Sequence, residues 1–64
     1  MGFNSVEYTI IREMQEKSGW RTTNELAELA QVAWETADKA LKSLYKKGYL
    51  VKGKKKQRIY WRLY

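Results

Sequence analysis

The sequence predicts a single, mainly helical α+β domain in which three helices precede a small antiparallel β-hairpin. Apolar residues recur at three- and four-residue spacing through most of the first 47 residues, as on the buried faces of amphipathic helices. Apolar and polar residues alternate near the C-terminal end, which is typical of a half-buried strand. The 64 residues include no proline and no low-complexity stretch, so we expect residues 1–64 to form one domain.

The first helix is expected over about residues 4–18. Asn4 or Ser5 can cap its N-terminus, and Glu7 falls in its first turn, where a negative charge suits the helix dipole. Ser18-Gly19 is a stop signal. The apolar stripe of this helix consists of Val6, Ile10, Ile11 and Met14.

Two further helices are expected with a tight turn between them. Thr22 and Glu25 have the spacing of a capping box, so a helix should run from about 23 to 30. After a turn at 31–33, another should run from about 34 to 47 and end in a basic turn followed by glycine. Their predicted buried faces are Leu26, Leu29 and Ala30 on the second helix and Ala37, Ala40, Leu41 and Leu44 on the third.

The C-terminal segment, residues 49–64, reads as a β-hairpin with strands at 49–52 and 57–64. The segment 53–56, Gly-Lys-Lys-Lys, is expected to form the bend, which places the lysines at an exposed tip. Trp61 alternates in line with Leu63 and is expected in the core. Earlier in the chain, residues 20–22 are too short for more than an isolated strand pair.

Charge is divided unevenly along the chain. Residues 1–41 hold four basic and seven acidic side chains, a net charge of −3, whereas residues 42–64 hold nine basic side chains and no acidic one, a net charge of +9. A lysine-rich solvated surface is the simpler interpretation. Complete segregation of the charge favours a polyanionic partner bound on one side of the molecule.

Composition argues against several other functions. The chain has no cysteine and no histidine, so the commonest zinc ligands and the commonest general base are missing. A domain this small has little room for a closed active site. We expect no enzyme activity, no cofactor or metal and no small-molecule substrate. No apolar run is long enough to span a membrane and no secretory signal stands at the N-terminus, so we expect a cytoplasmic protein.

The stretch TTNELAELAQVAWETADKALKSLYKKGYLVKGKKKQRIYWRL resembles the winged helix-turn-helix family. It combines an apolar helix, a short turn with Val32, a second apolar-faced helix, Lys-Lys-Gly-Tyr-Leu and a basic hairpin, which would be the wing (residues 49–64). The resemblance implies a transcriptional regulator that binds double-stranded DNA. The helix at 34–47 would enter the major groove, and the wing would contact the backbone or minor groove.

The resemblance and the exposed helix face together give a set of candidate DNA-binding residues. On the helix, Thr36, Lys39, Lys42 and Ser43 are expected to face bases or phosphates. The remaining candidates are basic residues at the helix end and in the wing: Lys46, Lys47, Lys52, Lys54, Lys55, Lys56 and Arg58. One such domain covers only about 600–1,000 Å² on DNA, so we expect a homodimer on the duplex. The sequence leaves open whether the free protein is a monomer or a weak dimer.

Several residues depart from the family pattern or leave alternatives open. Ala33 stands where a capping serine or threonine is common. Asp38 can accept a hydrogen bond from cytosine, although an ion pair with Lys42 at i,i+4 is the simpler interpretation. Trp34 either packs back on the preceding helix or touches a base or sugar. Surplus aromatic residues keep two other functions open: a protein-interaction module, and a binder of single-stranded nucleic acid or RNA.

Overall fold

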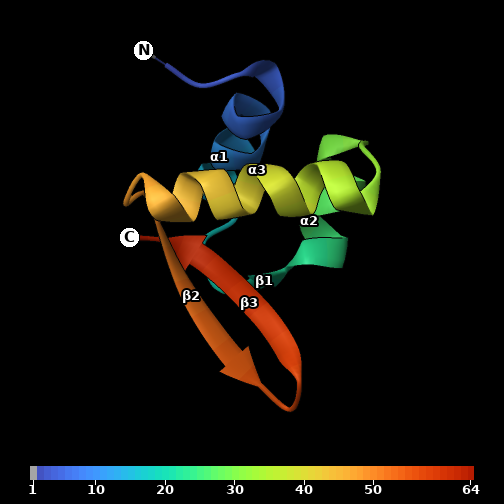
Figure 1. The fold of residues 1–64 in the computed structure, drawn as a ribbon, viewed down its shortest axis with the longest axis vertical. Helices are drawn as coiled ribbons and strands as arrows, with labels where there is room; N and C mark the ends of the chain where they lie inside the picture. The colour runs from blue at the N-terminus through green and yellow to red at the C-terminus, as the bar shows by residue number, and fades with distance from the viewer. Residues whose placement is uncertain (1) are drawn as a thin grey trace.

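The computed structural model describes residues 2–64, and Met1 lies outside the described residues. Three helices and an antiparallel three-stranded sheet form a mixed α+β structure, which confirms the predicted fold class and is consistent with a winged-helix-like arrangement. In chain order the elements are α1 (Ser5–Glu16), β1 (Arg21–Thr22), α2 (Thr23–Ala30), α3 (Trp34–Lys46), β2 (Leu50–Lys55) and β3 (Arg58–Leu63) (Figure 1).

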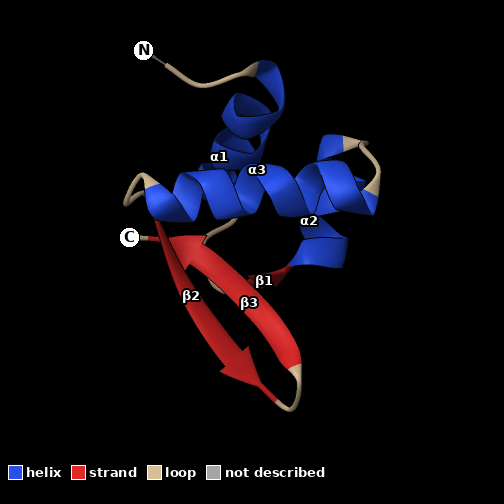
Figure 2. Cartoon of the chain, viewed as in Figure 1, coloured by secondary structure: helices blue, strands red, loops and turns tan. Residues whose placement is uncertain are grey.

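The helices gather at one end of the molecule, and the β2–β3 hairpin projects from them (Figure 2). This projection accounts for the elongated shape, 34 × 23 × 21 Å. Helix α2 has the predicted bounds, while α1 ends at Glu16, two residues before the predicted end. Helix α3 ends at Lys46, and Lys47 is its C-cap.

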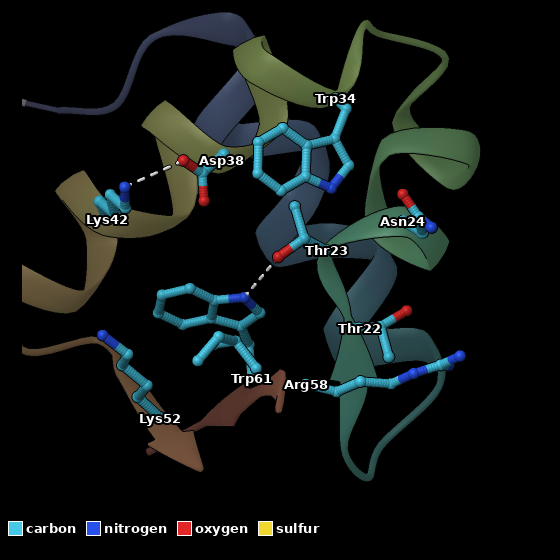
Figure 3. A pocket seen from close by; sticks show the side chains of 10 residues that line it. Thr22, Thr23, Asn24, Trp34, Asp38, Lys42, Lys52, Arg58 and Trp61 are labelled. Carbon is cyan, nitrogen blue, oxygen red and sulfur yellow. Dashed lines mark hydrogen bonds and ion pairs between the residues drawn. The ribbon is translucent and has the colours of Figure 1, made fainter. Parts of the chain in front are cut away.

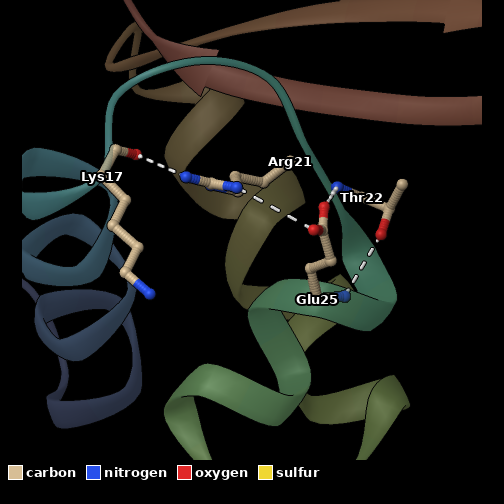
Figure 4. Close-up of polar contacts among 4 residues, drawn as sticks. All are labelled: Lys17, Arg21, Thr22 and Glu25. Carbon is tan, nitrogen blue, oxygen red and sulfur yellow. Dashed lines mark hydrogen bonds and ion pairs between the residues drawn. The ribbon is translucent and has the colours of Figure 1, made fainter.

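Side-chain caps begin the first two helices. Asn4 and Glu7 form a capping box at α1, so Asn4 is the cap of the two candidates. The predicted box at α2 is confirmed: the Glu25 N–H donates to Thr22 Oγ1 over 3.2 Å, and the Thr22 N–H donates to Glu25 Oε1 over 3.0 Å (Figure 4). Arg21 lies beside this box, 3.9 Å from the Glu25 carboxylate, and donates to the Lys17 carbonyl. These contacts set the direction in which β1 enters α2.

The turn between α2 and α3 is tight. Gln31 closes α2 in the left-handed conformation (φ 59°), and the Val32 N–H donates to the Ala27 carbonyl over 3.0 Å. Ala33 occupies the N-cap of α3, where its methyl group offers no acceptor, so the expected absence of a side-chain cap is confirmed.

One apolar cluster joins all three helices to the sheet. Its buried members are Ile10, Met14, Leu26, Ala40, Leu41, Leu44, Leu50 and Trp61. Trp61 is 1% exposed, as expected of a core residue, and its indole N–H donates to the buried Thr23 hydroxyl over 3.0 Å. The predicted buried face of α3 is confirmed, whereas Leu29 and Ala30 of α2 are only half-buried.

The predicted bend of the hairpin is wrong. Strand β2 continues through Gly53, and the turn consists of Lys56 and Gln57, both with positive φ (49° and 66°). Pairing runs from Leu50 opposite Leu63 to Lys55 opposite Arg58, which leaves a two-residue turn of the kind that matches strand twist. Lys54 and Lys55 therefore lie in a strand and not in a loop.

Gly53 has a different role from the one predicted. A Cβ atom built at this position would lie 3.0 Å from a ring carbon of Trp20, so glycine admits the indole against the strand. Trp20 precedes β1, the short strand predicted as an isolated pair, and β1 pairs with β3 at the edge of the sheet in the order β1-β3-β2.

Candidate nucleic-acid interface

The exposed side of α3 presents a basic surface. Ala37, Ala40, Leu41 and Leu44 bury one side of the helix, so the residues between them turn outward. Thr36, Lys39, Lys42 and Lys46 are exposed as predicted, and Ser43 is half-buried. An open groove of about 480 Å³, the α3 groove, is lined by Lys39, Lys42, Ser43, Lys46 and Lys47.

Lys42 is paired with an acid on its own helix. Its ammonium lies 3.0 Å from the Asp38 carboxylate, which confirms the expected i,i+4 pair. The Lys42 side chain is 64% exposed, so this surface pair stabilises α3 only slightly and is easily exchanged for a phosphate contact. Asp38 and the exposed Glu35 make the start of α3 less positive than its end.

Ser43 and Lys47 of the α3 groove lie beside the carboxylate of Glu7, a residue of α1. Glu7 is buried, with 3% of its surface exposed, and its Oε1 lies 3.3 Å from the Lys47 ammonium and accepts from the Asn4 N–H. A hydrogen bond from Ser43 is the main cause that holds the pKa of Glu7 below its ordinary 4.5, and the contacts with Asn4 and Lys47 act in the same direction against the opposing effect of burial. Lys47 thus connects α3 to α1, and Ser43 lies beside the same carboxylate, which limits what both residues can offer to DNA.

The cations of the wing have no carboxylate within salt-bridge distance among residues 2–64. They are Lys52, Lys54, Lys55, Lys56, Arg58 and Arg62, and on α3 the same holds for Lys39 and Lys46. Lys52 lies beside α3, its ammonium 5.5 Å from the ring centroid of Tyr45 and 5.8 Å from that of Trp61. These cation–π contacts hold Lys52 in place while leaving its charge uncancelled.

A hollow of about 450 Å³, the inner hollow, lies where α2, α3 and the wing meet (Figure 3). The start of α2 contributes Thr22, Thr23 and Asn24, α3 contributes Trp34, Asp38 and Lys42, and the sheet contributes Lys52, Arg58, Ile59 and Trp61. Lys42 also lines the α3 groove. Of the predicted site residues, Lys42 of α3 and Lys52 and Arg58 of the wing line this hollow, and the other eight do not.

Trp34 and Asn24 are two exposed members of the inner hollow that the candidate set lacks. Trp34 is 50% exposed and lies across the hollow from Trp61, so its indole is available to a ligand. The sequence left two interpretations of Trp34, packing on the preceding helix or contact with a base or sugar, and its exposure is compatible with the second. Asn24, one residue inside α2, carried no signal in the sequence.

Scans of protein-family models and of curated proteins find no match to this chain. Among residues 2–64, no helix is both long and apolar enough to cross a bilayer. The same residues contain no cluster of three or more side chains suited to a metal ion.

Replacing Glu7 by glutamine tests the α1–α3 contact. We expect Glu7→Gln to lower the free energy of unfolding by about 1–3 kcal/mol near pH 7, because the hydrogen bonds from Asn4 and Lys47 then end on a neutral amide and lose the charge of the carboxylate. The folded-state pKa of Glu7 is depressed, so its contribution is present above the unfolded value near 4.5 and is lost as pH falls through the folded value. Urea unfolding of both proteins should therefore converge in acid.

Glu16→Gln, at the exposed end of α1, is the matched control and should change stability little at any pH. A difference between wild type and Glu7→Gln that stays constant from about pH 7 to about pH 2 would contradict an ionised Glu7 in the folded protein.

Proposed function

We propose that this protein binds double-stranded DNA in the manner of a winged helix-turn-helix regulator, with α3 in the major groove and the wing on the backbone or minor groove. The observation that carries the proposal is that cations of α3 and of the wing share one surface: Lys42 lines both the α3 groove and the inner hollow, and Lys52 and Arg58 of the wing line the same hollow. Phosphate oxygens spaced along a duplex are the natural ligands of such a surface.

The dimensions of α3 suit this assignment. Its 13 residues give a length of about 20 Å, and a helix fits a major groove about 12 Å wide. Lys39 and Lys46 project from it without carboxylate partners among the described residues. Such a domain acts by occupying its site, blocking or recruiting other proteins, and this role requires it inside the cell.

A protein-interaction module is the second candidate, because large aromatic side chains stay exposed. Tyr8, Tyr49 and Tyr64 are 65%, 48% and 91% exposed, and none of them lines the inner hollow. Binding through these rings would depend on apolar contact and vary little with salt. Salt dependence therefore separates the two candidates.

Neutralising the wing tests the duplex-binding proposal. We expect Lys54→Gln, Lys55→Gln, Lys56→Gln and Arg58→Gln together to flatten the slope of log affinity against log salt by up to about 3.6, since up to four phosphate contacts are lost. The measurement is a titration of random duplex DNA at several salt concentrations. As a control, Arg12→Gln with Lys17→Gln removes charge from exposed positions of α1 and the segment after it, and should leave the slope unchanged. A quadruple variant with the wild-type slope would refute the role of the wing.

Lys39→Ala tests whether α3 reads bases. Selection of preferred sites from random duplex DNA should give wild type a sharper motif than the variant, because a lost bidentate base contact costs about 1–3 kcal/mol of discrimination. Lys55→Ala is the comparison: a lost phosphate contact weakens all sequences alike and leaves the motif intact. Equal sharpness in wild type and Lys39→Ala would show that Lys39 does not read bases.

The mass of the complex on a selected site tests the expected homodimer. Two copies should bind half-sites about one helical turn apart, with both α3 helices on one side of the duplex. Protein concentration is varied through the binding range while the mass of the complex is recorded. A 1:1 complex at saturation, formed without cooperativity on a site that lacks two-fold symmetry, would exclude the dimer.

A further inference from the structure

The sheet has a second face, turned away from the helical core, and it combines aromatic rings with cations. Successive residues of a strand point to opposite sides, so Tyr60 and Arg62 lie on the face opposite the buried Trp61. Gly53 is paired with Tyr60 and shares this outer face. Trp20 reaches the outer face from the segment before β1 and packs against Gly53.

Trp20 is held on this face by two contacts and still remains accessible. An ideal Cβ at Gly53 would lie 3.0 and 3.2 Å from two of its ring carbons, so the indole rests against the strand backbone. The guanidinium carbon of Arg62 lies 5.2 Å from the indole centroid. Even so, 45% of the Trp20 surface is exposed. An indole that is both positioned and partly exposed needs little further ordering to stack against a flat ligand.

A hollow of about 430 Å³, the outer hollow, lies beside this indole. Trp20, Gly53, Lys54, Lys55 and Tyr60 line it, and no carboxylate is among them. Two aromatic side chains therefore border a space whose only charges are positive. None of these five residues lines the inner hollow or the α3 groove, so the outer hollow is a separate surface.

We propose that the outer hollow binds single-stranded DNA, with an unpaired base stacked on Trp20 and the flanking phosphates on Lys54, Lys55 and Arg62. A duplex buries the faces of its bases and cannot use the indole, whereas an unpaired strand offers both flat faces and phosphates. An acidic peptide would satisfy the cations and leave the aromatic planes unused. The stacking surface is independent of the proposed duplex function. Only the choice of DNA over RNA as the bound strand rests on that function. Lysines of the wing line both the inner and the outer hollow, so we expect the same type of nucleic acid on both.

Fluorescence anisotropy of a labelled 12-nucleotide oligothymidylate tests the proposal. Wild type should bind it more tightly than an abasic strand of the same length and charge, because only the former can stack; this comparison needs no variant. Trp20→Leu retains an apolar side chain over Gly53 and should weaken oligothymidylate binding by about 5- to 150-fold while leaving the affinity for the abasic strand unchanged. Tyr8→Leu, which removes an exposed aromatic ring from α1, away from both hollows, should not weaken it.

Each alternative has its own outcome. Equal wild-type affinities for oligothymidylate and the abasic strand would overturn the proposal, as would unchanged binding by Trp20→Leu or displacement of oligothymidylate by an equally charged oligoglutamate. Tighter Trp20-dependent binding of oligouridylate would overturn the assignment to DNA. Duplex DNA is titrated in parallel: Trp20→Leu should retain wild-type duplex affinity, and an equal loss on both probes would refute a separate site. Failure of wild type to bind duplex, with Trp20-dependent binding of oligothymidylate intact, would reject the proposed function alone.

Discussion

The buried indole of Trp61 is the contact on which the rest of the architecture depends. It stands in the central strand β3, paired with Arg21 of β1 on one side and Lys52 of β2 on the other. Its N–H donates to Thr23 at the start of α2, and its ring meets Tyr45 of α3 edge-on at a centroid distance of 6.0 Å. One side chain thus joins the sheet to α2 and α3. Because a buried indole N–H without a partner costs about 1–3 kcal/mol, the bond to Thr23 also fixes how the ring is turned.

This fixed orientation determines where the cations of the wing lie relative to α3. The direction of the hairpin is set where Leu50 and Trp61 enter the core and where Ile59 and Leu63 pack against it. Crowding nine positive charges into residues 42–64 opposes folding through mutual repulsion. Glu7 and Asp38 offset two of them, at Lys47 and Lys42. The remaining repulsion is relieved by a polyanion, so a nucleic-acid ligand would stabilise the fold beyond its direct contacts.

Local sequence signals predicted most of this fold and failed where a distant contact decides. The capping box of Thr22 and Glu25, the apolar stripe of α3 and the core position of Trp61 all depend on residues close in sequence, and all three are confirmed. The predicted bend is misplaced because glycine at position 53 is also a common signal for a turn. Glycine is required at position 53 because the indole of Trp20, 33 positions earlier, packs against it. The turn itself consists of Lys56 and Gln57, which are not typical turn residues.

The candidate interface shows the same division between local and distant determinants. The i,i+4 spacing of Asp38 and Lys42 predicted their ion pair, whereas Lys47 meets Glu7 from 40 positions away. Periodicity places Ser43 on the accessible side of α3, yet the packing of α1 against α3 brings it beside the buried carboxylate of Glu7. Packing between α1 and α3 therefore makes Ser43 and Lys47 weaker candidates. The cations of α3 without a carboxylate partner among residues 2–64 are Lys39 and Lys46.

A sheet one layer thick lets the wing serve two surfaces at once. Its inner face holds Trp61 and borders the inner hollow, and its outer face holds Trp20 and borders the outer hollow. Lys54 and Lys55 of β2, the strand at one edge of the sheet, line the outer hollow, while Arg58 directly opposite Lys55 lines the inner one. Phosphates in the inner hollow and phosphates in the outer hollow would thus contact cations that lie next to each other on β2 and β3. If both proposed sites are used, a duplex on α3 and an unpaired strand on Trp20 would share the charge of the wing tip, and each would reduce the electrostatic attraction available to the other.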